Sequence, residues 1–251
     1  MPEMVRMTGI YLYAITEAAD QAALELRGFE RALVTILPYQ RIAAVVSPLA
    51  TPVEATPANL WLHEGVVEAL MPTCPVLPVR FGTLLPDDAR ARAFLEAHYQ
   101  AFATALERVR GRVELGLRVL WDDEAGHPAS AAVALEREDS LRSPGRQYLA
   151  ARLQEEHRTR AMRQRAEVLA GQIHQPLARL AVASTQKVLL TPRMLLAAAY
   201  LVDRERVDAV RAETEVLAAV FSALQFLCTG PWPPYHFVAD CLSEANFSPS
   251  S

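Results

Sequence analysis

Lysine is almost absent from this chain: Lys187 is the only one, and arginine supplies the remaining positive charge. The basic side chains number 25 against 29 acidic ones, which gives a formal net charge of −4. A chain without a basic excess lacks the positive surface that attracts phosphate backbones or anionic membranes. We therefore expect neither nucleic acid nor a membrane among its partners.

Cysteine is scarce as well. Cys74, Cys228 and Cys241 lie far apart, and no two of them have the CxxC spacing of a zinc or redox site. Such thiols fit a reducing compartment better than a secreted protein. The amino terminus lacks a signal-peptide pattern, and no apolar run approaches the length of about 18 residues that a membrane-spanning helix needs. We expect a cytoplasmic protein.

Motifs for catalysis and cofactor binding are missing from the sequence. It contains no GxGxxG or GxxxxGKS/T loop, no HExxH pair and no GxSxG elbow. The histidines do not cluster, since His63, His98 and His174 lie on different segments. The sequence therefore predicts no catalytic residues, no cofactor and no metal site, and hence a protein that is not an enzyme.

The first half of the chain mixes strand and helix patterns. Thr56-Pro57 is a helix start, with threonine as the cap and proline in the first position, and this helix should run to about Leu70 and bury Leu60. Beyond an extended segment at 76–85, apolar residues spaced three to four apart predict one amphipathic helix that ends at Gly111. Short apolar runs bounded by turn residues predict strands at 10–15, 32–37 and 42–46.

The second half has a more diagnostic order of elements. Val113–Trp121 alternates between apolar and other residues, as a half-buried strand does. A long helix begins at Ser143-Pro144, and Gly171 and Pro176 predict a kink or a break in it. Two strands (181–190 and 193–202), a helix after Asp203 and a strand at 223–228 follow. Strand, helix, strand, strand, helix, strand is the split βαβ order of ferredoxin-like folds.

These patterns together predict an α+β protein of two domains. Residues 1–111 would form an N-terminal α+β domain. Residues 112–251 would form a ferredoxin-like (βαββαβ) domain with the long helix, a proline- and aromatic-rich C-terminal segment and a short tail.

The segment Thr229–Phe237 is the most distinctive in the chain. It reads Thr-Gly-Pro-Trp-Pro-Pro-Tyr-His-Phe, so prolines and aromatic residues are concentrated next to an apolar strand. Proline fixes φ and removes a backbone donor. We therefore expect this segment to leave the strand as a rigid extended element, inside neither a sheet nor a helix.

This segment resembles the closing motif of the gas vesicle protein F and L family. A second segment, Val-Leu-Pro-Val-Arg-Phe-Gly-Thr at 76–83, also resembles that family, and weaker matches are Gly-Ile-Tyr-Leu-Tyr-Ala at 9–14 and Ser-Pro-Gly-Arg-Gln-Tyr-Leu at 143–149. The four occur in the family's order and span nearly the whole chain.

The resemblance implies a cytoplasmic, gas vesicle-associated accessory protein with a ferredoxin-like second domain and no enzymatic activity. Its implied partners are the hydrophobic gas vesicle shell protein and other accessory gas vesicle proteins. The protein would act as a chaperone-like assembly factor or stay in the vesicle as a minor component. A different reading is a small-molecule-binding or regulatory module, because ferredoxin-like domains often bind ligands.

Two groups of residues are candidates for an interaction surface or a domain interface. An unpaired guanidinium is too costly to bury, so Arg80 should either pair or clamp carbonyls at a domain junction or face a partner. Trp232 and Tyr235 either serve the fold, by sealing the end of the ferredoxin-like sheet or by packing on the first domain, or present a rigid aromatic surface to a partner. The full set is Arg80, Phe81, Trp232, Pro233, Pro234 and Tyr235. The charged run Arg152–Glu167 is either a solvated helix face or a docking face.

Overall fold

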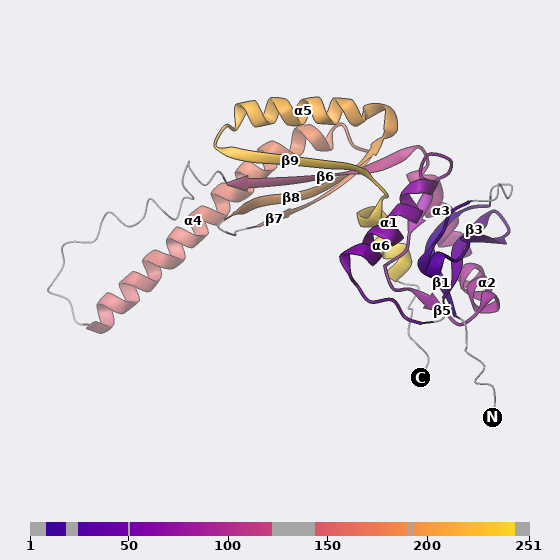
Figure 1. Ribbon diagram of the computed structural model, residues 1–251. Coiled ribbons are helices and arrows are strands. Elements are labelled where there is room, and N and C mark those ends of the chain that lie inside the picture. Colours follow the sequence, from indigo (N-terminus) through magenta and orange to yellow (C-terminus); the bar gives the residue numbers. More distant parts are fainter. Residues whose placement is uncertain are drawn as a thin grey trace. The chain divides into compact units, whose positions relative to one another are not determined.

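The computed structural model describes residues 9–18, 25–49, 51–121, 144–189, 191 and 193–243, with 144–151, 240, 242 and 243 described by their backbone alone. The chain forms two compact units (Figure 1). Unit 1 comprises the chain up to Glu114 together with the residues from Pro231 onward, and unit 2 comprises Leu115–Gly230. The mixed helix and sheet character that the sequence predicts is confirmed. Among the described residues, no helix has both the length and the apolar character needed to cross a lipid bilayer.

Unit 1 is built on an antiparallel sheet with β1 (Gly9–Glu17) at its centre. On one side β1 pairs with β3 (Ile42–Leu49), and β2 (Thr35–Tyr39) pairs with the outer side of β3. On the other side β1 pairs with the short strands β4 (Val76–Pro78) and β5 (Leu84–Leu85). The predicted strands of this half are therefore present, at or near their predicted positions.

Helix α1 (Pro57–Leu70) begins and ends where the sequence predicts. The Thr56 side chain caps it by accepting a hydrogen bond from the Asn59 backbone N–H at 3.3 Å. The prediction that Leu60 is buried is wrong, since this side chain is 45% exposed. The buried face of α1 instead begins one turn later, and its residues are His63, Val66, Val67 and Leu70.

The single helix predicted between residues 86 and 111 is two helices, α2 (Asp88–Ala97) and α3 (Tyr99–Val109). The break falls at His98, whose φ of −114° and ψ of 13° are not helical. The apolar spacing continues across this residue, because Phe94, His98 and Phe102 still pack ring against ring. Periodicity alone therefore could not reveal the break.

The sheet of unit 1 has a core on each face, because β1 sends alternate side chains to opposite sides. Ile10 and Leu12 pack in a core with residues of α2 and α3, and Tyr11 and Tyr13 pack in the other core with residues of α1. With both faces covered and both edges paired, the middle of β1 is fully buried.

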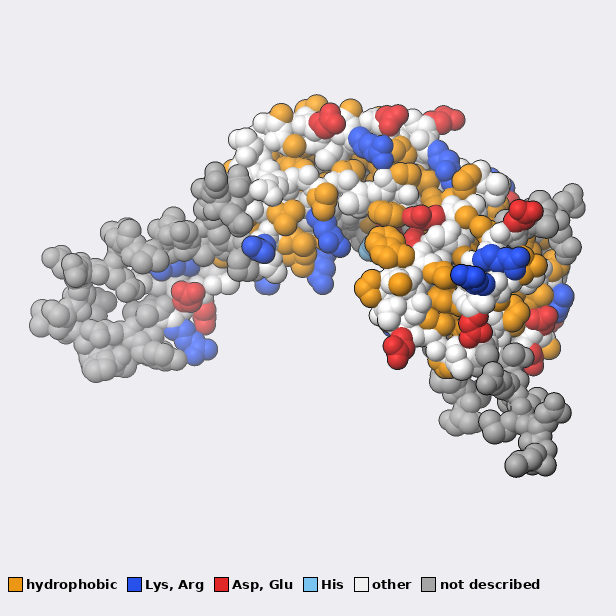
Figure 2. Space-filling model, in the orientation of Figure 1, with side chains coloured by type: hydrophobic (Ala, Val, Ile, Leu, Met, Phe, Trp, Pro, Cys, Tyr) orange, Lys and Arg blue, Asp and Glu red, His pale blue; other side chains and the backbone are white. Residues whose placement is uncertain are grey.

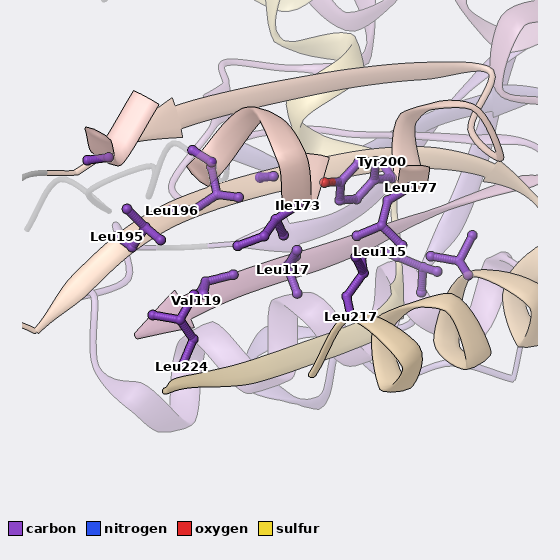
Figure 3. Close-up of a cluster of buried hydrophobic side chains, with 14 of the residues drawn as sticks. Leu115, Leu117, Val119, Ile173, Leu177, Leu195, Leu196, Tyr200, Leu217 and Leu224 are labelled. Carbon is purple, nitrogen blue, oxygen red and sulfur yellow. The ribbon is translucent and has the colours of Figure 1, made fainter. Parts of the chain in front are cut away.

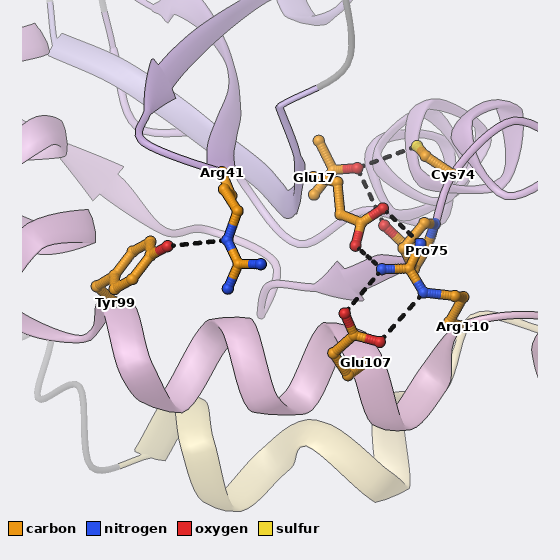
Figure 4. A network of polar contacts seen from close by, with 8 residues as sticks. Glu17, Arg41, Cys74, Pro75, Tyr99, Glu107 and Arg110 are labelled. Atoms are coloured by element: carbon orange, nitrogen blue, oxygen red, sulfur yellow. Dashed lines mark hydrogen bonds and ion pairs between the residues drawn. The ribbon is translucent and has the colours of Figure 1, made fainter.

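A polar network at one end of β1 links this sheet to its neighbours (Figure 4). The Arg110 guanidinium, just beyond α3, pairs with the carboxylates of Glu17 and Glu107. The Thr16 hydroxyl donates to the Pro75 carbonyl at 3.0 Å. These bonds fix the end of β1 against α3 and against the segment that leads into β4.

Unit 2 is a four-stranded sheet in the order β7-β8-β6-β9, with two helices. Along the chain its elements are β6 (Arg112–Trp121), α4 (Pro144–Ala178), β7 (Ala183–Val188), β8 (Met194–Asp203), α5 (Val207–Val220) and β9 (Leu224–Trp232). One apolar core joins α4 and α5 to the strands (Figure 3). Ile173 and Leu177 of α4 and Leu217 of α5 meet Leu115 and Leu117 of β6 there.

Two sequence predictions about proline differ from the structure. Helix α4 continues through Gly171 and Pro176, so the alternative of a break there is wrong. Pro176 lies in the last turn, where the hydrogen bond it removes is one of the last in the helix. Strand β9 likewise continues through Pro231 to Trp232, because β9 is an edge strand and proline is tolerated there.

The end of the chain also differs from the prediction. The predicted second domain extends to residue 251, whereas the chain from Pro231 onward belongs to unit 1. There α6 (Tyr235–Ser243) places Val238 in the same core as Leu12 and Phe102. Buried apolar contact, which the linear sequence does not display, decides this grouping.

The core of unit 2 should depend strongly on the buried half of α4. We expect Ile173→Ala to lower the free energy of unfolding by about 2–5 kcal/mol, since it leaves a cavity at a fully buried position. Chemical denaturation of the purified protein measures this. Val168→Ala, on the same helix but 57% exposed, is the control and should cost little. Equal losses for the two variants would contradict the packing described.

Candidate functional site

Three of the four distinctive sequence segments meet in unit 1. Residues 9–14 form most of the first strand there, residues 76–83 follow α1, and the end of the 229–237 segment forms the start of α6. The fourth segment, 143–149, lies at the start of α4 in unit 2, where Ser143 falls outside the described residues. The candidate site is thus the part of unit 1 where these three segments converge.

The Tyr11 hydroxyl links the first two segments. It lies 3.0 Å from His63 Nδ1 and accepts a hydrogen bond from the Gly82 backbone N–H at 2.9 Å. His63 Nε2 lies 3.1 Å from the Val79 carbonyl, which can only accept, so Nε2 carries the proton. Nδ1 is then the acceptor, and the Tyr11 hydroxyl donates to it. In this series of hydrogen bonds, each donor therefore meets an acceptor and each acceptor meets a donor.

Tyr13 anchors a second group of contacts beside the first. Its hydroxyl accepts the Phe29 backbone N–H at 3.1 Å and lies 3.0 Å from Ser47 Oγ. Gly28 approaches so closely that a Cβ there would lie 2.1 Å from the Tyr13 hydroxyl, so a side chain at this position would displace the tyrosine. The rings of Tyr11, Tyr13, Phe29, His63 and Phe81 form one packed cluster, in which Tyr13 stacks on Phe29 and His63 and the other contacts are tilted or edge-to-face.

Arg80 lies at the outer end of the loop that these contacts hold. Its side chain is exposed, and within the described part of the chain it makes no ion pair or side-chain hydrogen bond. The turn around it is fixed, because Thr83 Oγ1 donates to the Arg80 carbonyl at 2.7 Å and Gly82 has a φ of +85°, which favours glycine. Phe81, the next residue, points its half-buried ring toward His63.

The C-terminal segment supplies the other predicted residues. Trp232 is half-buried at the end of β9, Pro233 and Pro234 are buried, and Tyr235 begins α6. The Tyr235 hydroxyl donates to Glu64 Oε2 of α1 at 2.6 Å. This contact ties the returning chain to the helix that also carries His63.

Glu114 makes the second attachment of this segment. Its carboxylate accepts the His236 backbone N–H at 2.9 Å and contacts His236 Nδ1 at 2.6 Å. A carboxylate at the first turn of a helix satisfies a free N–H and meets the positive end of the helix dipole. Glu114 therefore acts as a cap for α6 that comes from a distant part of the sequence.

Burial shifts the pKa values of several groups in this network. It raises the pKa of Tyr11 to about 12 and lowers that of His63 to about 4, so His63 is neutral at physiological pH. Burial also raises the pKa values of the Glu64 and Glu114 carboxyls, against the opposing effect of their hydrogen bonds. The pKa of Tyr235 is raised by burial and by its bond to Glu64.

These contacts hold backbone segments in place. Both ring nitrogens of His63 are engaged, and Glu64 and Glu114 bind a phenol and a helix terminus. Among the described residues, no group of three or more His, Cys, Asp or Glu side chains could hold a metal ion. The arrangement is suited to presenting a surface.

An exposed apolar pair lies beside this network. Trp61 is 69% exposed and Leu60 is 45% exposed, and both lie one turn before Glu64 on α1, at positions i−3 and i−4 from it. We call these two residues the α1 apolar pair. Figure 2 shows hydrophobic side chains exposed on the visible face of unit 1.

Sequence reasoning identified the segments but missed the residues that join them. Tyr11, His63, Glu64 and Glu114 were not among the candidates, although they make the hydrogen bonds that connect the segments. Two tyrosines at i and i+2 in an apolar strand, facing one side, are a usable signal, because a buried phenol requires a partner.

Removing the Tyr11 hydroxyl should destabilise unit 1 without creating a large cavity. We expect Tyr11→Phe to lower the free energy of unfolding by about 1–3 kcal/mol, because His63 Nδ1 and the Gly82 N–H both lose their partner. Thermal and urea denaturation measure the change. Tyr99→Phe is the matched control, because among the described residues the Tyr99 hydroxyl accepts a hydrogen bond only from the exposed Arg41 side chain. If Tyr99→Phe cost as much, the buried chain would not be the cause.

The raised pKa of Glu64 gives a signed pH dependence. The folded state holds the Glu64 proton more tightly than the unfolded state, so this carboxyl stabilises the fold fully below its ordinary pKa, and that contribution is lost as the pH rises through the raised value. Glu64→Gln keeps an oxygen for Tyr235 and removes the charge. We expect the stability of Glu64→Gln relative to the unmodified protein to increase from mildly acidic to neutral pH.

Denaturation curves at a series of pH values test this. Glu96→Gln, an exposed change on α2, controls for the loss of one negative charge. A stability difference between Glu64→Gln and the unmodified protein that stayed constant with pH would show that the Glu64 carboxyl does not titrate as its burial requires.

Comparison with known proteins identifies the family of this chain. The family model described as "Gas vesicle synthesis protein GvpL/GvpF" matches residues 9–239. The chain is 32% identical to gas vesicle protein L of Streptomyces sp. (strain CB03234), covering 90% of this chain and 91% of that protein. It is 27% identical to gas vesicle protein F2 of Halobacterium salinarum (strain ATCC 700922 / JCM 11081 / NRC-1), with 91% of each covered.

Solved structures agree in fold. The crystal structure of gas vesicle protein GvpF from Anabaena sp. PCC7120 matches with a TM-score of 0.72 at 21% identity, covering 97% of this chain and 98% of that one. GvpF from Microcystis aeruginosa also matches with a TM-score of 0.72, at 19% identity, covering 91% of this chain and 98% of that one. The match of the family model over most of the chain shows that this protein belongs to the gas vesicle GvpL/GvpF family.

Proposed function

We propose that this protein is a non-enzymatic accessory factor for gas vesicle assembly that binds the hydrophobic shell protein, other accessory gas vesicle proteins, or both. Family membership supports the gas vesicle role. It fits a cytoplasmic location, with the protein acting as an assembly helper or as a minor component of the vesicle. Shell subunits before polymerisation expose apolar surfaces and strand edges that aggregate unless they are covered.

The observation that carries the binding role is how unit 1 holds Arg80. The guanidinium is exposed at the tip of a turn that Tyr11 and Thr83 fix from behind. A turn whose backbone is already fixed loses little backbone entropy on binding. Trp61, at 69% exposure, supplies the large exposed aromatic group that binding surfaces commonly use. Phe81, Trp232 and Tyr235 lie in partly buried positions of the same unit.

The second unit fits a ferredoxin-like (βαββαβ) domain, and we propose that assignment. Two observations support it: the element order β6-α4-β7-β8-α5-β9 and the strand order β7-β8-β6-β9. A sheet with both helices on one face leaves edge strands, here β7 and β9, that a partner strand could extend.

Co-expression with the major gas vesicle shell protein tests the binding role. We expect soluble shell protein to appear and co-purify only when this chain is present. Arg80→Glu and Trp61→Ala should each lower the soluble fraction of the shell protein several-fold, because each removes a side chain of the proposed binding surface. Both side chains are exposed, so their replacement should leave the fold intact.

Matched controls separate binding from folding. Arg90→Glu makes the same charge reversal at another exposed position of unit 1. Trp232→Ala is informative only if its melting temperature is unchanged, because that side chain is half-buried. Unchanged soluble shell protein with folded Arg80→Glu and Trp61→Ala would show that these residues do not form the binding surface.

A further inference from the structure

The amino-terminal half of α4 extends beyond the core of its own unit. From Arg152 to Arg165 every side chain is exposed apart from the half-buried Met162, and the first residue of α4 in the unit 2 core is Ala166. Fourteen residues of helix are about 21 Å long. Figure 1 shows this part of α4 running on past the strands. We call residues Arg152–Arg165 the α4 arm.

The sheet does not need the α4 arm, yet the sequence maintains it as a helix. A helix that is polar all round receives little stabilisation from packing. The arm compensates with residues of high helix propensity, chiefly arginine, glutamate, glutamine, alanine and leucine. It also contains one i,i+4 ion pair, between Arg152 and Glu156 at 3.6 Å. Helix propensity and the ion pair therefore stabilise the α4 arm as a helix although it does not pack in a core.

The α4 arm is basic in a chain that is acidic overall. It carries five arginines against two glutamates, whereas the whole chain has a net charge of −4. Within the described part of the chain, Arg158, Arg160, Arg163 and Arg165 have no carboxylate within ion-pair distance. Four guanidinium groups on one helix, each with five N–H donors, are therefore available to an outside acceptor.

The positions of these arginines define the shape of the acceptor. Arg158 and Arg165 are seven residues apart and so share one side of the helix, and Arg160 and Arg163, three residues apart, share another. The two pairs span about two turns and about one turn, spacings at which carboxylates can recur along the face of a second helix. Guanidinium and carboxylate groups can then meet in bidentate pairs.

Other anionic partners fit the α4 arm less well. Leu153 and Met162 lie nine residues apart and hence on opposite sides, so the arm has no apolar stripe with which to lie in a membrane. Glu155 and Glu156 interrupt the positive surface, and the chain's net negative charge repels a nucleic acid duplex, with one phosphate per about 1.7 Å of its axis, more strongly than a helix with one carboxylate per turn of about 5.4 Å. We infer that the α4 arm is a docking surface for an acidic α-helical surface of another protein.

Fluorescence anisotropy with the full chain tests this inference. The probe is a labelled alanine-based helical peptide with one glutamate per turn, and its twin carries lysine in place of each glutamate. We expect the glutamate peptide to bind and the lysine peptide not to bind. Binding should weaken about tenfold or more when the salt concentration rises from about 50 to about 300 mM, because exposed charges are screened.

The variant that removes the surface is Arg158→Gln, Arg160→Gln, Arg163→Gln and Arg165→Gln combined. We expect about tenfold or greater weakening of glutamate-peptide binding. Its matched control has the same net charge, with four exposed arginines outside the arm replaced by glutamine: Arg90, Arg108, Arg193 and Arg206. This control should bind as the unmodified chain does. Circular dichroism tests whether both variants retain their helix content, as we expect for substitutions at exposed positions.

Several outcomes would overturn the inference. Equal weakening in the two variants would mean that only net charge matters. Tighter binding of an RNA duplex or of phosphatidylserine vesicles than of the glutamate peptide would assign the arm to nucleic acid or membrane. Binding that appeared only after Glu136, Glu138 and Asp139 of the preceding segment were neutralised would make that segment the occupant. None of these readouts depends on the shell protein, so the gas vesicle role is tested separately.

Discussion

A single buried hydroxyl organises unit 1. The Tyr11 phenol lies where it cannot reach water, so it must find both an acceptor and a donor within the protein. It finds the acceptor in His63 on α1 and the donor in the Gly82 N–H of the loop after β4. Because His63 in turn binds the Val79 carbonyl, the strand, the helix and the loop are held in one arrangement. Arg80 lies between Val79 and Gly82 in that loop, so these hydrogen bonds also fix the backbone position of the exposed Arg80.

The same logic explains how the C-terminal helix is held. Glu64 and Glu114 are carboxylates in largely buried positions, which disfavour a charge and raise their pKa values. Each is retained because it satisfies a group that would otherwise lack a partner, the Tyr235 hydroxyl and the first turn of α6. The two buried carboxylates thus lower the stability of unit 1 at neutral pH, and their hydrogen bonds fix the position of α6 within the unit.

Local patterns in the sequence predicted the elements well and their grouping poorly. The cap at Thr56, the strand at 113–121 and the start of α4 at Pro144 follow from short-range chemistry, and the structure has all three. The break at His98 and the continuation of β9 through Pro231 depend on neighbours in space, so periodicity and proline rules gave the wrong answer. The residues of the site were hidden for the same reason, because Tyr11 and Gly82 are distant in sequence.

Unit 1 is not continuous in the chain, and this has a consequence during synthesis. On the ribosome, residues 115–230 emerge in full before α6, whose Val238 completes the core beside Leu12 and Phe102. Unit 2 can therefore finish folding while the N-terminal sheet still lacks part of its cover and the Glu64 and Glu114 carboxylates still lack their partners. A nascent or truncated chain that lacks α6 would expose an apolar surface that α6 covers, so quality control could distinguish chains with and without this helix.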